Sequence, residues 1–334
     1  MDWSMADIPH QRGRIVLITG GSGGIGLETA RALAARGAHT VLACRDVRRG
    51  RAAADALDGR ADVVRLDLAS LDSVRQAADE VRRRYGRLDV LVNNAGVMFP
   101  PRPYTEDGFE AHFGVNHLGH FALTGLLLDL MRQVPGSRVV TVASLAHRIA
   151  PGGFDADGAR SGDGRRSVAA YGRSKLANLM FSRELQRRLA DEGAGTVSVA
   201  AHPGLSATGL WHGDAPALLR PVSRIALRAL ARPQGRAAEP VLRAATDHRV
   251  PGGAYLGPGR LFETRGAPVP VGSGRNARSV REQRRLWELS EELTGVRYGR
   301  PSRGEREGRA AAGAGRDGGP SGGALPRHRP RGAA

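Results

Sequence analysis

Short apolar runs alternate with stretches of helical periodicity from residue 14 to about residue 257. The apolar runs have the length of buried strands, and the amphipathic stretches between them are long enough to cover a sheet. This alternation predicts βαβ units, so we expect one α/β domain with a doubly wound, mostly parallel, seven-stranded sheet. The expected strands are 14–19, 39–44, 62–66, 88–92, 138–142, 196–200 and 253–257. The expected helices are 24–36, 47–57, 71–85, 107–131, 170–190, 235–247 and 279–293.

Four segments stand outside this pattern. Residues 1–12 form an N-terminal extension to a domain that covers 13–295, and the Gly-rich, charged residues 148–168 are typical of a surface loop. Residues 205–232 interrupt the alternation, and within them arginines recur at every fourth position from 220 to 232, which favours a solvated helix face. Residues 296–334 are rich in Gly, Ala, Pro and Arg, a composition that cannot build a core, so we expect a disordered tail.

The chain is strongly basic, with a formal net charge of +17 over 334 residues. Residues 300–334 alone hold eight arginines against three acids, which accounts for +5 of that surplus. The remaining charge is spread over the domain with few aromatic side chains for base stacking, so no nucleic-acid partner is expected. Binding of the tail to an anionic surface stays an alternative, and it predicts steep salt dependence.

Compartment is indicated by the cysteine count and by hydropathy. Cys44 is the sole cysteine, which excludes an internal disulfide framework, and the first residues lack a long apolar run. The longest apolar run, residues 121–131, is too short to span a bilayer and contains Asp129. We therefore expect a cytoplasmic protein without an integral membrane segment.

The first expected strand leads directly into the sequence TGGSGGIG, residues 19–26, and then into a helix. Glycines at such a turn let the backbone approach a pyrophosphate, whose charge meets the amides and the positive dipole of the helix start. The placement of this loop at the first βα turn predicts a Rossmann-type dinucleotide site.

The end of the second expected strand reads VLACRD, which bears on the choice of cofactor. An arginine at this position accommodates the 2′-phosphate of NADP, whereas an acid accepts from the 2′-hydroxyl of NAD. Arg45 favours NADP(H), because a guanidinium fork fits a phosphate while Asp46 can point away. NAD(H) remains possible.

The sequence YGRSK, residues 171–175, contains the only lysine of the chain, although 50 residues are Lys or Arg. Tyr171 and Lys175 are four positions apart in an expected helix and so share one face. A nearby cation stabilises a phenolate and lowers the pKa of a tyrosine, which makes it a usable acid and base. A compact ammonium can reach a phenol and a ribose together, which the rigid guanidinium of arginine cannot do.

At this point the sequence resembles the short-chain dehydrogenase/reductase family, over about residues 12 to 295. The matching motifs are TGGSGGIG (19–26), Asp67 in RLDLAS, NNAG (93–96), Asn116 in GVNHLGHF, Ser144 in TVASLAH, YGRSK (171–175), and HPG (202–204) with Thr208. Phrases such as LACRD, NNAGVM and SKLAN are most similar to the branch of retinol dehydrogenases and WW-domain oxidoreductase-like proteins. That branch mostly prefers NADP(H), in agreement with Arg45.

The resemblance implies reversible transfer of a hydride between a nicotinamide and a small alcohol, aldehyde or ketone. Ser144 would polarise the substrate oxygen, Tyr171 would be the general acid and base, Lys175 would lower the pKa of Tyr171, and Asn116 would anchor a relay water. Residues 205–232 would form a substrate lobe. The implied cofactor-binding residues are Gly20, Ser22, Gly24, Ile25, Gly26, Arg45, Asp67, Leu68, Asn93, Ala95, Gly96, Tyr171, Lys175, Pro203, Gly204 and Thr208.

Other hypotheses stay beside this one. The chain could be a catalytically idle NADP(H)-binding sensor or interaction module, although such a module has no chemical need for all four catalytic residue types. Formation of a homo-oligomer is possible from the resemblance. No metal site is expected, since the histidines that could be metal ligands lack acidic or cysteine partners at ligand spacing and favour packing roles. These candidates are His112, His117, His120 and His147.

Overall fold

The computed structural model describes residues 2–57, 61–150, 168–204 and 234–299. The chain divides into two units, Met1–Val296 and Arg297–Ala334, and only the first three residues of the second unit are described. The expected substrate lobe at 205–232 and nearly all of the expected tail lie outside the described residues, as does most of the 148–168 loop. Among the described helices, none has the length and apolar character needed to cross a membrane.

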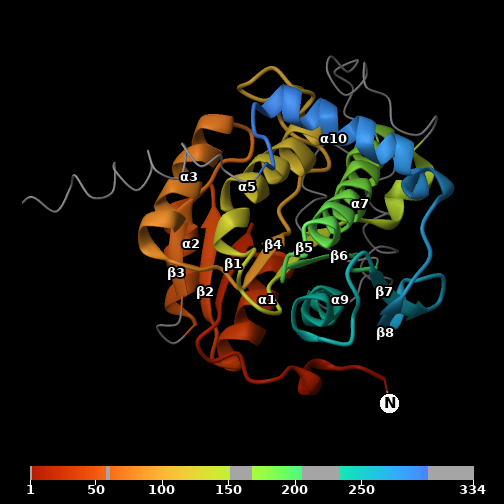
Figure 1. The fold of residues 1–334 in the computed structure, drawn as a ribbon. Helices are drawn as coiled ribbons and strands as arrows, with labels where there is room; N and C mark the ends of the chain where they lie inside the picture. Colours follow the sequence, from red (N-terminus) through yellow and green to blue (C-terminus); the bar gives the residue numbers. More distant parts are fainter. Residues whose placement is uncertain (1, 58–60, 151–167, 205–233, 300–334) are drawn as a thin grey trace, which may run out of the picture. The chain divides into compact units, whose positions relative to one another are not determined.

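In the described part of the first unit the strands form one eight-stranded sheet, in the order β3-β2-β1-β4-β5-β6-β7-β8 (Figure 1). All neighbours are parallel except β7 and β8. The order reverses between β1 and β4, which is the position where doubly wound folds bind their ligands. The strands are β1 (Ile15–Thr19), β2 (His39–Cys44), β3 (Ala61–Arg65), β4 (Val90–Asn93), β5 (Arg138–Val142), β6 (Val197–Ala201), β7 (Tyr255–Arg260) and β8 (Arg265–Pro270).

The expected fold class is confirmed, but the expected number of strands is wrong by one. Strand β8 has the sequence RGAPVP, whose prolines and glycine give no apolar alternation. It pairs antiparallel with β7 at the edge of the sheet, where Pro268 and Pro270 need not donate to a further strand. The pairing with β7, and not a local propensity, makes this segment a strand.

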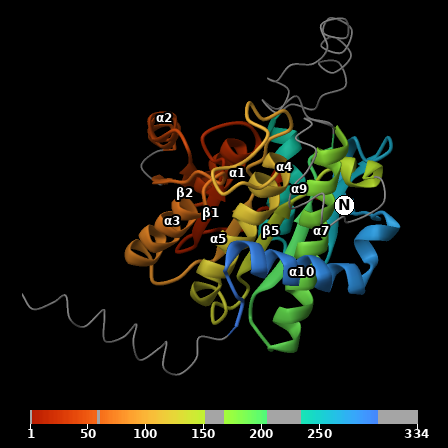
Figure 2. The ribbon, with the colours of Figure 1, turned by 90° about the horizontal axis from the view of Figure 1, so that it is seen from above.

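Helices cover both faces of the sheet (Figure 2). One apolar cluster joins α1, α2 and α9 to β1, β4, β5 and β6. A second cluster joins α7 and α10 to β5, β6 and β7 on the opposite face, where α3 also packs against α5. The helices are α1 (Gly24–Ala35), α2 (Val47–Asp55), α3 (Leu71–Arg84), α5 (Gly119–Leu127), α7 (Val168–Asp191), α9 (Gln234–Thr246) and α10 (Val280–Thr294), with the short turns η1 (Met5–Asp7), η4 (Leu145–Ile149) and η7 (Arg275–Arg278).

The helix expected over 107–131 is not continuous. It begins at α4 (Ala111–Phe113), where the Glu110 carboxylate accepts from the first amides, and opens into a π-helical turn, η2 (Gly114–Leu118). It then continues as α5 and ends in a 3-10 turn, η3 (Leu128–Leu130). The π-turn places Asn116 at its middle, and π-bulges of this kind are frequent at functional sites.

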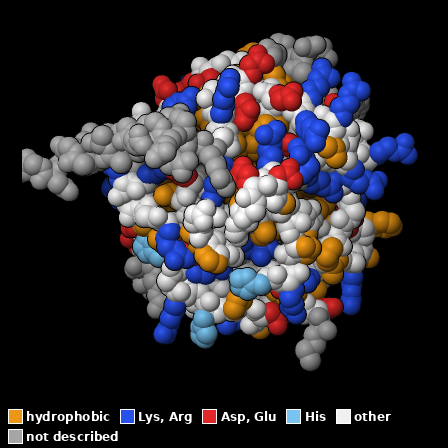
Figure 3. All heavy atoms as spheres, in the orientation of Figure 1, with side chains coloured by type: hydrophobic (Ala, Val, Ile, Leu, Met, Phe, Trp, Pro, Cys, Tyr) orange, Lys and Arg blue, Asp and Glu red, His pale blue; other side chains and the backbone are white. Residues whose placement is uncertain are grey.

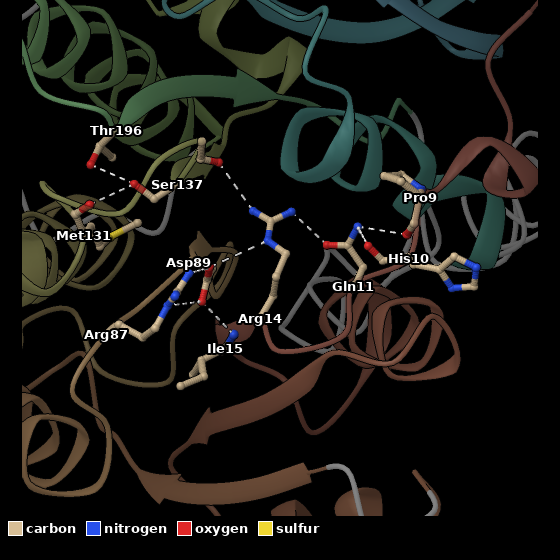
Figure 4. A network of polar contacts seen from close by, with 11 residues as sticks. Pro9, His10, Gln11, Arg14, Ile15, Arg87, Asp89, Met131, Ser137 and Thr196 are labelled. Carbon is tan, nitrogen blue, oxygen red and sulfur yellow. Dashed lines mark hydrogen bonds and ion pairs between the residues drawn. The ribbon is translucent and has the colours of Figure 1, made fainter.

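Residues before β1 pack on the domain. Trp3 and Ile8 are buried in the same cluster as α1, and Arg36 donates to the carbonyl of Ala6 at 2.9 Å. At the start of β1, the buried carboxylate of Asp89 accepts from the amide of Ile15 at 3.0 Å and is flanked by arginines (Figure 4). These contacts fix the end of the sheet opposite the glycine-rich loop.

Arginine side chains are distributed over the face seen in Figure 3, with acidic side chains among them. On this face the Lys and Arg side chains are denser toward the upper right, where acidic side chains lie beside them. Charges of both signs side by side are typical of a solvated surface.

Candidate active site

The carboxyl ends of β1, β4, β5 and β6 bring the sequence-predicted residues to one edge of the sheet. This follows from the parallel pairing of β1 with β4, β4 with β5 and β5 with β6. Residues that follow these strands, which lie far apart in the sequence, are therefore neighbours in space.

The glycine-rich loop after β1 is tightly packed against the segment after β4. Gly20 has φ 67°, and a Cβ there would lie 3.2 Å from Ala95 and from the side-chain nitrogen Nδ2 of Asn94. A Cβ on Gly26 would lie 2.5 Å from the carbonyl oxygen of Gly20. Helix α1 starts after Gly23 without any side-chain cap. No side-chain cap thus accepts from the first amides of α1, which is the arrangement that a dinucleotide phosphate requires.

Thr19 joins this loop to the segment after β4. Its hydroxyl accepts from the amides of Asn94 and Ala95, both at 2.9 Å, and Asn94 donates from its side chain to the Thr19 carbonyl at 2.8 Å. The side chain of Asn93, by contrast, turns into the core and donates to Thr124 at 2.9 Å. Sequence reasoning selected Asn93 and missed Asn94 and Thr19, although NNAG directly after a strand marked the segment.

Two arginines follow β2, Arg45 directly after the strand and Arg49 in the first turn of α2. Asp46 caps α2 by accepting from the amide of Arg49 at 3.0 Å, so its carboxylate faces the helix. Arg45 is exposed, and the guanidinium of Arg49 reaches the loop, since a Cβ on Gly23 would lie 2.7 Å from its terminal nitrogen. Arg49 was not anticipated, because the contact connects α2 to a loop more than twenty residues earlier.

Three further residues of the expected cofactor set lie around the same edge. Asp67 follows β3 and accepts from the amide of Ala69 at 3.0 Å. Leu68 is buried against the start of α5, where a Cβ on Gly119 would lie 2.8 Å from the Leu68 carbonyl oxygen. Ser22 hydrogen-bonds the thiol of Cys44, whose pKa is raised by burial.

Lys175 and Asn116 meet beside Gly96. A Cβ on Gly96 would lie 3.2 Å from Oδ1 of Asn116 and 3.4 Å from Nζ of Lys175. Lys175 donates to the carbonyl of Val142 at 3.0 Å, and Nζ lies 5.8 Å from the centre of the Tyr171 ring. Three elements, η2, α7 and the segment after β4, thus converge on one point.

Ser144 completes the group from the end of β5. Its side chain hydrogen-bonds Tyr171, and its Oγ accepts from the amide of Ala146 at 3.2 Å, which starts η4. The four residues that the sequence marked as catalytic therefore lie together. These are Asn116, Ser144, Tyr171 and Lys175.

Burial dominates the electrostatics of this group. It raises the pKa of Tyr171 to about 12, although the hydrogen bond with Ser144 acts in the lowering direction. It lowers the pKa of Lys175 to about 8. The direction for Tyr171 differs from the lowering that its spacing from Lys175 predicts, because loss of solvation outweighs a cation 5.8 Å from the ring centre.

Asn116 is held by four hydrogen bonds. Its Oδ1 accepts from the amide of Val97 at 2.8 Å, and its Nδ2 donates to the carbonyl of Val97 at 3.0 Å and to Ser174 at 2.9 Å. Its backbone carbonyl accepts from Nδ1 of His120 at 3.0 Å. Both amide hydrogens are used, which leaves one lone pair on Oδ1, the atom that lies beside Gly96.

The turn after β6 reaches the same edge. Gly204 has φ 77°, and its amide donates to Nδ1 of His202 at 3.2 Å across Pro203. A Cβ on Gly204 would lie 2.9 Å from the carbonyl oxygen of Thr264, in the turn between β7 and β8. Thr208, the other residue expected here, lies outside the described residues.

The four histidines considered as metal candidates are all buried, as their expected packing roles require. His112 bonds Glu110 at 2.6 Å, and His120 bonds the hydroxyl of Thr19 at 2.8 Å. Within the described ranges, no group of three or more His, Cys, Asp or Glu residues is arranged to hold a metal ion. The residues concerned are His112, His117, His120 and His147.

Comparisons with known proteins agree with this geometry. The short chain dehydrogenase family model matches residues 14–217. Retinol dehydrogenase 14 of Mus musculus is 38% identical over 302 residues, which cover 85% of this chain and 86% of that protein. Retinol dehydrogenase 12 of Mus musculus is 47% identical over 199 residues, or 58% of this chain. That match spans 61% of the length of the relative.

Two solved structures share the architecture. An uncharacterized protein from Mycobacterium paratuberculosis is 41% identical with a TM-score of 0.75, over 90% of this chain and 100% of that chain. A short chain dehydrogenase from Burkholderia cenocepacia in complex with NADP is 26% identical with a TM-score of 0.58, over 74% of this chain and 96% of that chain. The chain therefore belongs to the short-chain dehydrogenase family, in its retinol dehydrogenase-like branch, and is an oxidoreductase of a family that binds NAD(P).

Proposed function

We propose that this enzyme interconverts a small alcohol and the corresponding aldehyde or ketone with NADP(H), with Tyr171 as the general acid and base. The observation that carries the proposal is the meeting of Nζ of Lys175 and Oδ1 of Asn116 beside Gly96. A lone buried ammonium without a carboxylate partner is unfavourable in a core, and perturbed groups of this kind cluster at functional sites.

The protonation state of Tyr171 suits reduction at neutral pH. Burial raises its pKa to about 12, so the phenol keeps its proton until a substrate oxygen accepts it. The hydroxyl of Ser144, hydrogen-bonded to Tyr171, directs a second donor to the same oxygen. When bound, the nicotinamide cofactor supplies or takes up the hydride.

Lys175 and Asn116 restore the proton. As negative charge develops on the phenol oxygen, the nearby ammonium of Lys175 stabilises it. The free lone pair of Asn116 Oδ1, beside that ammonium, accepts from a water that returns the proton from solvent.

The cradle also fits NADP(H) better than NAD(H). Arg45 directly follows β2, and Arg49, in the first turn of α2, contacts the loop at Gly23. The carboxylate of Asp46, which would serve the ribose hydroxyl of NAD, is engaged in capping α2. The related Burkholderia cenocepacia enzyme was solved with NADP.

The test measures oxidation of NADPH, and separately of NADH, by absorbance against a panel of aldehydes and ketones. We expect turnover with NADPH that falls by about a hundredfold or more in Tyr171→Phe and in Lys175→Arg. Arg187→Lys is the control, because it changes a cation on the same helix that pairs with Glu184 and Asp191. If NADPH binds tightly but no carbonyl is turned over, the proposal of an idle sensor replaces this one.

A further inference from the structure

Glu263, in the turn between β7 and β8, bridges two segments that carry site residues. One carboxylate oxygen accepts from Arg148 at 2.5 Å, and the other accepts from Nε2 of His202 at 3.1 Å. Arg148 lies four residues after Ser144 in η4, and His202 begins the turn that ends at Gly204. The carboxylate thus connects the serine segment to the turn.

The protonation of the two histidines around this bridge follows from their partners. His202 accepts the amide of Gly204 at Nδ1, so its proton sits on Nε2 and is donated to Glu263. His147 accepts the amide of Gly274 at Nε2 and so donates from Nδ1 to the carbonyl of Ser144 at 2.7 Å. Each imidazole therefore holds one backbone group of the site in a fixed orientation.

Both imidazoles rest on one ring. The ring centres of His147 and His202 lie 5.6 Å and 5.2 Å from that of Tyr255, which is buried at the start of β7. This common platform limits how far either segment can shift independently. The sheet already joins the two segments, since the amide of Ala143 donates to the carbonyl of Ala201 at 2.8 Å, and the carboxylate of Glu263 adds a side-chain connection beyond the strand ends.

The backbone around Glu263 is strained. Leu261, Phe262 and Glu263 have φ values of 50°, 53° and 62°, in the left-handed region that favours glycine. Such residues persist only where surrounding contacts determine them, and they cluster at functional positions. Phe262 is 95% exposed and Leu261 is 62% exposed, so their side chains do not anchor the turn. The carboxylate of Glu263 does.

We propose that Glu263 is a positioning residue, which sets the spacing between the Ser144 segment and the His202–Gly204 turn on either side of the substrate. This inference rests on the proposed carbonyl reduction, because the spacing matters for a substrate oxygen held at Ser144. The backbone of Glu263 supports the same role, since its carbonyl oxygen would lie 3.3 Å from a Cβ on Gly204. The turn and the strained loop are thus in direct contact.

The experiment compares Glu263→Gln and Arg148→Met, which remove the charge from either end of the bridge, with the wild-type chain. Asp129→Asn is the control, since it removes the carboxylate of an ion pair with Arg82 between α3 and η3. Amide hydrogen exchange is measured in peptides that cover 145–149 and 202–204. We expect exchange there to accelerate about tenfold in both variants. Exchange in these two segments should not change in Asp129→Asn, and exchange in α3 should not change in Glu263→Gln or Arg148→Met.

Steady-state kinetics give the second readout. We expect both bridge variants to raise the KM for the carbonyl substrate about tenfold and to change kcat by less than about twofold, since the chemical groups stay in place. Unchanged exchange and unchanged KM in Glu263→Gln and Arg148→Met would overturn the inference. If the wild-type chain turns over no carbonyl, the proposed function fails, and the exchange measurements alone decide whether Glu263 holds the two segments together.

Discussion

The ammonium of Lys175 donates to the carbonyl of Val142 at 3.0 Å, and its nitrogen lies 5.8 Å from the centre of the Tyr171 ring. Lys175 is thus a buried cation that bonds a backbone oxygen at the end of β5, next to the serine of the site. Asn116 and Lys175 both lie next to Gly96. The compact head of lysine fits this space, whereas a guanidinium would meet Gly96 and Asn116.

The first prediction concerns the amount by which the burial of Lys175 lowers the free energy of unfolding. Burial lowers its folded-state pKa to about 8 from 10.5, so the unfolded chain binds more protons between pH 8 and 10.5. The resulting destabilisation, about 3 kcal/mol, is fully present below pH 8 and is lost as pH rises towards 10.5. After loss of the hydrogen bond to Val142, we expect Lys175→Met to be about 2 kcal/mol more stable than wild type at pH 7.

Urea unfolding at pH 7, 9 and 10.5 checks this prediction. The advantage of Lys175→Met should shrink across that series. Arg51→Met is the control, since Arg51 is exposed on α2 and its loss should give no pH-dependent difference. A Lys175→Met variant that is less stable than wild type at every pH would contradict the burial argument.

A second prediction addresses cofactor choice. Arg45→Ala and Arg49→Ala should each raise the dissociation constant of NADPH by about tenfold, because each removes a cation near the expected 2′-phosphate. Binding of NADH, which lacks that phosphate, should change by less than about twofold. Titration followed by nicotinamide fluorescence measures both, with Arg51→Ala as the control on the same helix. Equal losses for the two cofactors would show that neither arginine reads the phosphate.

Short-range sequence patterns are sufficient to predict most of the fold and the central part of the site. Strand–helix alternation, the glycines of 19–26 and the four-residue spacing of Tyr171 and Lys175 are all short-range patterns, and each has a physical reason that is independent of the rest of the chain. The resemblance supplied Ser144 and Asn116, and the structure places both with Tyr171 and Lys175.

The features that sequence reasoning missed depend on distant contacts. Strand β8 exists because β7 pairs with it, and Arg49 reaches Gly23 from another element. The π-helical turn around Asn116 lies between two apolar helical segments, so the hydrophobic periodicity of the sequence does not reveal it. Glu263 lies more than a hundred residues from Arg148, and its left-handed backbone could not be expected for a glutamate.

The third prediction tests how tightly the glycine-rich loop packs around Gly26. A Cβ at Gly26 would lie 2.5 Å from the carbonyl oxygen of Gly20 and 2.6 Å from the side-chain nitrogen Nδ2 of Asn94, so the backbone must shift. We expect Gly26→Ala to weaken NADPH binding at least about tenfold and to lower the free energy of unfolding by about 1–3 kcal/mol. Gly86→Ala, where nothing lies within 4 Å, should change stability by less than about 0.5 kcal/mol. Tight NADPH binding by Gly26→Ala would mean that the loop can open.

The last prediction follows from three buried histidines. Burial lowers the pKa of His117 to about 3 and that of His120 and His202 to about 4, from 6.5. Each is neutral in the folded protein, and the unfolded chain binds more protons between pH 6.5 and 4. Stability is therefore present above pH 6.5 and is lost as pH falls, at up to about 1.4 kcal/mol per pH unit for each histidine.

Because three such slopes add and a domain of this size is only marginally stable, we expect acid unfolding between about pH 6 and 4, before most exposed carboxylates are protonated. Circular dichroism along a pH titration, with urea unfolding at pH 7 and 6, measures the midpoint and the slope. His117→Leu should reduce the slope by about a quarter to a third, since it removes one titrating group while His120, His202 and His147, whose pKa burial also lowers, remain. His248→Gln should leave it unchanged, because His248 is exposed. A wild-type chain that keeps its full stability to pH 4 would contradict this prediction. It would show that His117 on η2 and His120 on α5 gain solvent or a partner when they are protonated.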